Sequence, residues 1–439
     1  MNSILITIVQ FFASLSLLVL IHEFGHYITA RMCKVRVEKF YLFFDPWFSL
    51  FKFTSKKTNT EYGIGWLPLG GYVKIAGMID ESMDKEQMAL PPKPDEFRSK
   101  PAGQRLLIML AGVIMNFLLA IFIYSMILFT WGEEYVLTSN MKAGMDFSPI
   151  AQTIGFQDKD ILLSADGKPF DKYDVQLLRK IADSKQVVVL RNGEKVSITI
   201  PEDFMLKIAS AEQGFASPRY PMVIDKVMKN SIAEKAGLMP MDSIYAINNT
   251  ITETFADVTS ELQKYKSQEI IVHLYRNGRQ QEVTLTPNEN GKLGVQVMPY
   301  TRIFTSFKKE YGFFASIPAG IRLGINTLKG YVSDMKYLFT KEGAKSVGSF
   351  FTIGNLFPPV FNAQIFWNIT AFLSIILAVM NILPIPALDG GHAVILLYEV
   401  ITRRKPSDKF LEYVQIAGMI FLFALMALAL GNDIRRFFF

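Results

Sequence analysis

Cysteine and histidine are both scarce in this chain, which has one cysteine, Cys33, and four histidines among its 439 residues. A single cysteine excludes a disulfide scaffold and any metal cluster built from several cysteines. Charged residues make up 20% of the chain and hydrophobic residues 50%, which excludes a disordered or highly charged protein. At this length we expect about two to four domains.

The basic residues do not form a single stripe. The formal net charge is +6 and the sequence pI is about 9.0, a balance that many nucleic-acid-binding proteins share. Lysine and arginine are scattered around long apolar runs, whereas a nucleic-acid surface gathers them on one face. We therefore expect no nucleic-acid partner and favour a membrane protein in contact with lipid.

Apolar runs long enough to cross the roughly 30 Å hydrocarbon core of a membrane as helices occur four times. They cover residues 5–21, 106–131, 365–383 and 414–430. Buried core helices are the alternative, but all four runs contain few polar residues. The first run lacks the basic start and small-residue cleavage site of a signal peptide, so we expect it to be retained. With their flanks, the expected spans occupy 1–32, 104–132, 363–400 and 409–432.

Lysine and arginine near the ends of the spans predict the orientation. Basic residues follow the first run, precede the second and fill the loop before the fourth, whereas Glu133 and Glu134 follow the second. The segments 33–103 and about 401–409 are therefore expected on the cytoplasmic side. The long segment after the second span, and both chain termini, are expected on the opposite side.

The long outer segment contains an internal repeat. Two pairs of stretches align, 155–167 with 237–249 and 187–201 with 271–287. In each copy an amphipathic helix precedes two strands that are joined by an Asn-Gly turn. We expect two tandem copies of one small domain, at 133–215 and 216–300.

This order of elements, with a Gly-x-x-x-x-Asp turn that enters a strand, resembles the PDZ domain. Glycine usually precedes that aspartate, but Lys159 and Met241 stand there, so we expect a less favourable turn. PDZ domains bind an extended peptide as an added strand at their sheet edge. The resemblance implies peptide partners, and the alternative is that the two copies are spacers or plugs.

Residues 304–339 carry apolar side chains at every third or fourth position, with lysine and arginine between them. This pattern predicts one or two amphipathic helices, which lie on a membrane surface or pack on a partner. Packing against the second repeat is an equal alternative. We assign 301–362 to amphipathic helices and a linker.

The sequence His22-Glu23-Phe-Gly-His26 ends the first apolar run. Side chains four positions apart share a helix face, so both imidazoles can reach one metal ion. Glu23 can then act as general base on a water at the metal and later donate the proton. Two histidines that are merely satisfied in a core are the alternative, but ionisable groups at membrane depth are costly and usually functional.

A catalytic zinc site needs a third protein ligand and an open position. The third apolar run ends in Asn381-Ile-Leu-Pro384-Ile-Pro386-Ala-Leu-Asp389-Gly-Gly-His392. Asp389 is the candidate ligand, because it is a lone carboxylate between apolar stretches; His392 competes for this role or has a structural one. The prolines and glycines predict a broken helix, which is tolerated at membrane depth where backbone lines a cavity.

These motifs, with Gly112-x-x-x-Asn116 in the second run, resemble the site-2 protease family of intramembrane zinc metalloproteases. The four spans with tandem outer domains resemble its bacterial branch, and the resemblance covers essentially the whole chain. It implies one zinc ion bound by His22, His26 and Asp389, with Glu23 as the catalytic acid and base. By the same resemblance, Asn381, Pro384 and Pro386 border the substrate, Gly112 and Asn116 pack helices near the site, and His392 matches no ligand.

The glycine-rich stretch 60–78 resembles the family's membrane-associated β-hairpin. A helical substrate must unwind before water can attack its carbonyls, and an edge strand that pairs with the unwound segment offsets the lost hydrogen bonds. We expect this role for Gly70, Gly71, Tyr72, Val73 and Lys74. The alternative is an ordinary amphipathic hairpin on the membrane surface.

The expected fold is a polytopic α-helical membrane protein with four transmembrane helices, two PDZ-like α/β domains on the periplasmic side and a cytoplasmic β-hairpin. By resemblance we expect an inner-membrane endopeptidase that cleaves single-span membrane proteins, such as an anti-sigma factor, and remnant signal peptides, with the repeats excluding bulky ectodomains. One alternative is a non-proteolytic peptide-binding scaffold with a structural metal. A metal transporter is disfavoured, because the second and fourth runs contain no ionisable residue.

Overall fold

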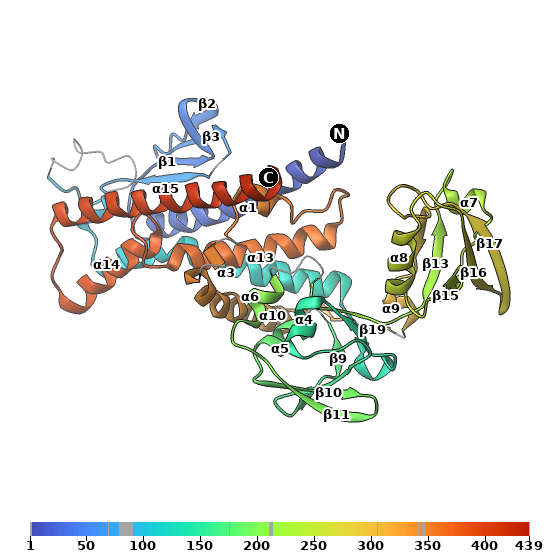
Figure 1. Cartoon of the computed structure of the whole chain (residues 1–439). Coiled ribbons are helices and arrows are strands. Elements are labelled where there is room, and N and C mark those ends of the chain that lie inside the picture. The colour runs from blue at the N-terminus through green and yellow to red at the C-terminus, as the bar shows by residue number, and fades with distance from the viewer. Residues whose placement is uncertain are drawn as a thin grey trace. The chain divides into compact units, whose positions relative to one another are not determined.

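The chain folds into two compact units. The computed structural model describes residues 2–68, 70–78, 91–174, 176–209, 214–304, 306–340, 343–344 and 347–438. One unit comprises Met1–Gly132 and Glu310–Phe439, and the other comprises Glu133–Lys309 (Figure 1). Some of the segments expected from the sequence include residues that the structure does not describe. These residues are 69, 79–90, 175, 210–213, 305, 341–342 and 345–346.

Within the described residues, four helices of the first unit are long and apolar enough to cross a membrane, which confirms the four expected spans. They are α1 (Asn2–Met32), α3 (Ala102–Trp131), α13 (Ala363–Ile382) and α15 (Asp408–Phe438). Helix α3 contacts both α1 and α13. Helices α1 and α3 approach closely because α1 has a glycine at the contact. A Cβ at Gly25 would lie only 2.5 Å from the carbonyl oxygen of Ala111.

The third span is broken, as its prolines and glycines predict. Helix α13 ends at Ile382, a turn follows, and α14 (Asp389–Thr402) begins. Ala387 in this turn has a φ of 73°, a left-handed conformation that few non-glycine residues adopt. The returning backbone is packed so closely that a Cβ at Gly390 would lie 2.2 Å from the carbonyl oxygen of Leu383.

The segment between α1 and α3 forms a four-stranded sheet, which corrects the hairpin expected over about 60–78. Four strands form a mixed sheet in the order β2-β3-β1-β4. They are β1 (Val37–Leu42), β2 (Phe44–Thr54), β3 (Glu61–Leu67) and β4 (Tyr72–Ile75). Strand β1 lies between β3 and β4; it is parallel to β3 and antiparallel to β4. The hairpin in this sheet is instead β2–β3, while β4 lies at the sheet edge.

The expected helical segment 304–339 is partly a strand. Residues Ser306–Lys309 form β19, and a helix, α10 (Phe313–Asp334), follows. Helix α10 packs on α3 through small residues, since a Cβ at Gly320 would lie 2.6 Å from the backbone nitrogen of Ser125. A partner of this helix is therefore one of the four helices long and apolar enough to span a membrane. The remaining short helices of this unit are η1 (Phe97–Ser99), η3 (Met335–Phe339) and α12 (Phe350–Gly354).

The second unit is built from short strands and helices around two separate apolar cores. Its first half contains β5 (Glu133–Leu137), η2 (Thr138–Asn140), β6 (Met145–Phe147), α4 (Pro149–Ile154), β7 (Ile161–Ala165), β8 (Lys168–Pro169), β9 (Lys172–Tyr173), α5 (Leu177–Ala182), β10 (Gln186–Arg191), β11 (Glu194–Thr199), α6 (Phe204–Ala209) and β12 (Ala216–Pro218). Its second half contains β13 (Met222–Val227), α7 (Ile232–Lys235), β14 (Ser243–Ile247), β15 (Thr250–Ile251), α8 (Phe255–Lys264), β16 (Ile270–Arg276), β17 (Arg279–Leu285), β18 (Val295–Val297) and α9 (Tyr300–Ile303). Strand β12 pairs with β6, and β19 pairs with β5, so both strands complete this unit.

The aligned stretches of the two halves make the same contacts. The main sheets run β11-β10-β7-β8 and β17-β16-β14-β13-β18, and each contains the expected hairpin. Asp160 and Asp242 are fully buried, and each pairs with an arginine of its own hairpin, Arg191 at 2.7 Å and Arg276 at 2.6 Å. The two residues that replace the usual glycine, at 159 and 241, have φ values of 73° and 69°. Both turns therefore take the less favourable form that the sequence predicts.

We expect Arg276→Leu to lower the free energy of unfolding of the second half by about 3 kcal/mol, because it leaves the Asp242 carboxylate buried without its partner. Arg279→Leu removes the same charge from an exposed position of the same hairpin and is the control. Limited proteolysis of the full-length protein in detergent at rising temperature gives the midpoint of unfolding of each variant. Equal midpoints for the two variants would contradict this role of the ion pair.

Candidate metal centre and active site

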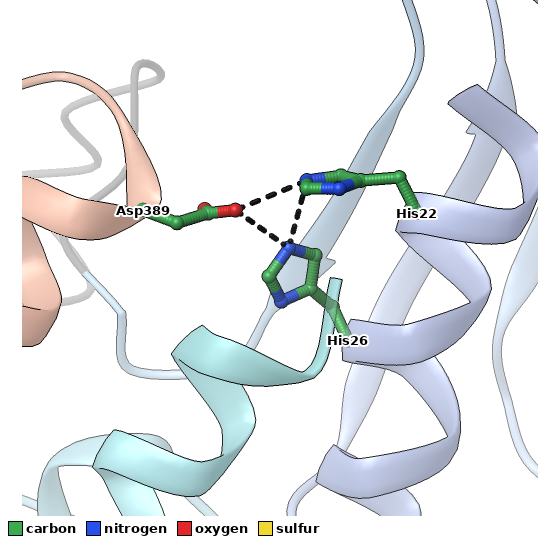
Figure 2. A group of neighbouring side chains, drawn as sticks. All are labelled: His22, His26 and Asp389. Carbon is green, nitrogen blue, oxygen red and sulfur yellow. Dashed lines mark hydrogen bonds and ion pairs between the residues drawn. The ribbon is translucent and has the colours of Figure 1, made fainter. Parts of the chain in front are cut away.

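Two imidazoles of α1 point toward the same place. His22 and His26 lie one helical turn apart and are both buried, with 6% and 7% of their surface exposed. Their Nε2 atoms lie 3.2 Å from each other. The four-residue spacing therefore turns one nitrogen of each imidazole toward the same point, as the sequence predicts (Figure 2).

Asp389 reaches this point from α14 (Figure 2). Its Oδ2 lies 3.0 Å from Nε2 of His22 and 3.3 Å from Nε2 of His26. The residue is the first of α14, where the helix dipole favours a negative charge. The break after α13 is what brings this carboxylate back toward α1.

The three side chains fit a zinc ion. Nitrogen and oxygen ligands at 2.0–2.1 Å in a tetrahedral site lie roughly 3.3–3.4 Å apart, close to the observed 3.0–3.3 Å separations. Asp389 Oδ2 is buried without a hydrogen-bond donor. Two imidazole nitrogens and a carboxylate oxygen all offer lone pairs, and lone pairs this close repel one another. A cation bound between the three atoms would remove that repulsion. Among the described residues, these three form the cluster that could hold a metal ion.

Gly112 of α3 forms the floor of this site. A Cβ at this position would lie 2.4 Å from His26 Nε2 and 2.8 Å from His22 Nε2. Any side chain here would therefore contact the two ligand nitrogens themselves. The role is more specific than the helix packing that the sequence resemblance implies.

The outer nitrogens of both histidines are held by α3. Nδ1 of His26 lies 2.9 Å from the carbonyl oxygen of Ile108 and donates a hydrogen bond to it. Nδ1 of His22 lies 3.2 Å from Nδ2 of Asn116, whose Oδ1 is buried without a partner. Turning the Asn116 amide by 180° satisfies both groups, because His22 Nδ1 then donates to Oδ1. In that arrangement both Nε2 atoms are free to bind a metal.

A cavity of about 490 Å³ opens beside the three ligands. Glu23 lines it, as do His392 and the strand segment 71–75. Tyr72 in this wall donates a hydrogen bond to Asp45 at 2.9 Å. Burial, together with that bond to a carboxylate, raises the pKa of Tyr72, so its hydroxyl remains a neutral donor. Glu23, the three candidate ligands and the edge strand β4 therefore border one cavity.

The other predicted site residues divide into two groups. Asn381 reaches the centre, with Nδ2 3.4 Å from His22 Nε2. Gly71, just before β4, allows the backbone to pass close to β1, since a Cβ there would lie 2.6 Å from the carbonyl oxygen of Tyr41. Pro384 and Pro386 lie in the turn between α13 and α14 and are not among the residues that line the cavity. Pro386 instead packs against Gly418 of α15.

Several cavity residues were not predicted from the sequence. They include Lys39, Phe44, Met78, Met109 and Gln415. Gln415 is 5% exposed near the start of an apolar helix, so a buried amide in a membrane span was an available signal. The others carry no local signal, because they reach the cavity only through the sheet and α3.

Comparison with known proteins gives matches along the whole chain. The sequence model of peptidase family M50 matches residues 10–425. A regulator of sigma E protease from Haemophilus influenzae is 29% identical over 461 residues, covering 97% of this chain and 98% of that protein. The regulator of sigma-E protease RseP of Escherichia coli K12 is 27% identical over 469 residues, covering 99% and 100%. A Vibrio cholerae protein named as a zinc metalloprotease is 28% identical over 480 residues, with the same coverage.

Gly112→Ala is expected to abolish zinc binding, because the added methyl group contacts both ligand nitrogens. Gly103→Ala, in the same helix with nothing within 4 Å of its Cβ, is expected to keep one zinc ion per chain and is the control. Metal analysis of the detergent-purified proteins measures both. Full zinc content in Gly112→Ala would show that the metal lies elsewhere.

Asn116→Leu is expected to lower zinc affinity about 10- to 100-fold, since His22 loses the acceptor that fixes its ring. Asn116→Asp keeps an acceptor oxygen and should retain most of the affinity. Competition with a chromogenic chelator gives both values. Equal losses in the two variants would mean that Asn116 acts through packing alone.

Proposed function

This chain belongs to peptidase family M50 and is a zinc metalloprotease of the site-2 protease type, and from that premise we propose that it cleaves single-span membrane proteins within or near their transmembrane helix. The observation that carries the proposal is the meeting of His22, His26 and Asp389 beside a cavity that also contains Glu23. His22, Glu23 and His26 lie on α1, and Asp389 begins α14 after the turn that follows α13; α1 and α13 are both apolar enough to span a membrane.

We propose His22, His26 and Asp389 as the zinc ligands and Glu23 as the catalytic acid and base. When bound, zinc polarises the scissile carbonyl and lowers the pKa of the attacking water. Glu23 takes the proton from that water and returns it to the leaving amine. Ile108 and Asn116 hold the two imidazoles with Nε2 directed inward, and Asn381 borders the same point.

The substrate strand is proposed to pair with β4. Peptide carbonyls in a transmembrane helix are hydrogen-bonded within that helix, so the segment to be cut must unwind. Within the described residues β4 is the last strand of its sheet, and residues 71–75 line the cavity. We propose that residues 70–74 offer the unwound segment replacement hydrogen bonds. This proposal uses the edge strand of the four-stranded sheet, and no longer the hairpin that the sequence predicts.

The cellular setting follows from charge distribution and from the relatives. We propose that 33–103 and about 401–409 are cytoplasmic and that 133–309 lies in the periplasm with both termini, in an inner membrane. The two PDZ-like halves of 133–309 would bind peptides or exclude substrates with bulky ectodomains, so that another protease must trim the substrate first. The relatives named as regulators of sigma-E proteases make an anti-sigma factor the first substrate to test, with remnant signal peptides second.

A structural-metal scaffold remains the rival function, and the site argues against it. Structural zinc sites are closed by four protein ligands, whereas the described residues bring together three beside an open cavity. A general base is also of no use to a scaffold. Catalysis therefore explains more of the site than metal-supported folding does.

Glu23→Gln is expected to lower cleavage of a tagged single-span substrate with a trimmed ectodomain by at least about 1000-fold, because the carboxamide cannot accept the proton of the water. Zinc content should stay at one ion per chain, since Glu23 is not a ligand. Appearance of the cytoplasmic fragment in cells, together with metal analysis, measures both. Equal cleavage by the variant and the wild type would remove Glu23 from the mechanism and favour the scaffold.

A further inference from the structure

A buried amide of α15 borders the catalytic cavity. Gln415 is 5% exposed and lines the cavity of about 490 Å³ together with the three candidate metal ligands and Glu23. Among the described residues that line this cavity, it has the one side-chain amide. It lies in a helix long and apolar enough to span a membrane, where a buried amide costs free energy unless it has a partner.

The amide of Gln415 has no hydrogen-bond partner among the described residues. Neither of its polar atoms is sealed away from accessible space. Gln10 of α1 shows the contrast: it is about as buried, at 4% exposed, but its Nε2 donates a hydrogen bond to the carbonyl oxygen of Pro358 at 2.8 Å. The donor and the acceptor of Gln415 can therefore bind a molecule that enters the cavity.

Close packing of the backbone holds Gln415 beside the metal centre. A Cβ at Gly418, three residues farther along α15, would collide with the carbonyl oxygen of Pro386. Pro386 lies in the turn that leads from α13 to Asp389. Residues three apart share a helix face, so the contact at Gly418 also fixes where Gln415 lies relative to this turn.

Gln415 lies where two cavities adjoin. Met78, His392 and Gln415 line both the catalytic cavity and a second cavity of about 80 Å³. A segment that extends from the metal centre toward the second cavity passes these three side chains. Of the three, Gln415 alone combines a donor and an acceptor in a group that does not titrate.

An extended substrate has backbone groups that β4 cannot reach. In a strand, the N–H and C=O of one residue point to the same side and those of the next residue to the other side, so a neighbour on one edge pairs with only half of them. The other half faces away from β4 and, at membrane depth, needs partners within the protein. A side-chain amide fits this need, because its C=O and N–H complement the N–H and C=O of one residue.

We propose that Gln415 binds the backbone N–H and C=O of one substrate residue that faces away from β4, and so is a second anchor for the unwound segment. This inference rests on the proposed protease function and on the proposed pairing with β4. The substrate is then held by two separate elements, β4 and α15. Because Gln415 contacts backbone and not side chains, the anchor serves substrates of different sequence.

An ester scan of the substrate tests the anchor. In a synthetic single-span peptide with a short outer part, each peptide bond within five residues of the scissile bond, except that bond itself, is replaced in turn by an ester. An ester has no N–H and a weaker acceptor. With the purified wild-type protein in detergent, we expect esters that disturb binding to β4 or to Gln415 to lower kcat/KM about five- to tenfold, the effect of about one net hydrogen bond.

Replacement of Gln415 separates the two kinds of position. In Gln415→Leu we expect one ester, or two adjacent ones, to be cleaved as fast as the parent peptide, while the other sensitive positions keep their wild-type ratios. Gln415→Met fills the space with an unbranched side chain and should give the same result. Gln10→Leu makes the same change at a similarly buried amide that does not line the cavity, and should keep every wild-type ratio.

Zinc content of one ion per chain identifies the variants that are folded, and each ratio of ester to parent peptide is taken within one variant. Equal ratios in the wild type, Gln415→Leu and Gln415→Met at every position would overturn the assignment to Gln415 and leave the proposed protease function intact. A wild-type protein that cleaves every ester as fast as the parent peptide would overturn both backbone anchors, again with the function intact. Cleavage of no peptide by the zinc-loaded wild-type protein would overturn the proposed function, and this inference with it.

Discussion

Three electron-rich atoms meet between helices that are otherwise apolar, and the rest of the transmembrane unit is arranged around that contact. Nε2 of His22, Nε2 of His26 and Oδ2 of Asp389 lie 3.0–3.3 Å apart. Without a cation the three lone pairs repel one another, and the two histidines are buried. The helices can approach this closely only because glycine stands at positions 25 and 112, where side chains would strike neighbouring backbone or the ligands themselves.

Helix α3 serves both as the floor of the metal centre and as its outer support. The carbonyl of Ile108 and the amide of Asn116 take the second nitrogen of each imidazole, so one helix fixes both rings. Ser374 of α13 in turn donates a hydrogen bond to the backbone oxygen of Asn116 at 2.7 Å. Polar groups at membrane depth need partners within the protein, and here those partners orient the two histidines proposed as metal ligands.

The four-stranded sheet forms a stiff wall for the catalytic cavity. Tyr41 and Tyr72 stack with ring centroids 5.2 Å apart, and their hydroxyls donate hydrogen bonds to Glu61 and Asp45. These contacts tie the edge strand β4 to the strands behind it. Under the proposed pairing, a substrate strand would meet a preorganised template at this edge, which reduces the entropy lost on binding.

How much the sequence predicts differs from one part of the site to another. The two histidines, Glu23 and the broken helix before Asp389 are local patterns, and the structure brings the three ligands together as expected. Asn116 was expected to pack helices, yet it contacts His22, 94 positions away in the chain. Lys39 carries no signal of its own, because it reaches the cavity only through the pairing of β1 with β4.

The sequence by itself determined the four spans, the metal-binding spacing and the tandem repeat, because bilayer thickness, helical periodicity and turn geometry all act on neighbouring residues. Only the tertiary structure decided that β1 separates β3 from β4, that α10 packs on α3, and which groups hold the outer nitrogens of the ligands. These features depend on contacts between segments far apart in the chain. No local pattern encodes them, because the free energy that selects one pairing over another arises only when the whole sheet and the helices are packed together.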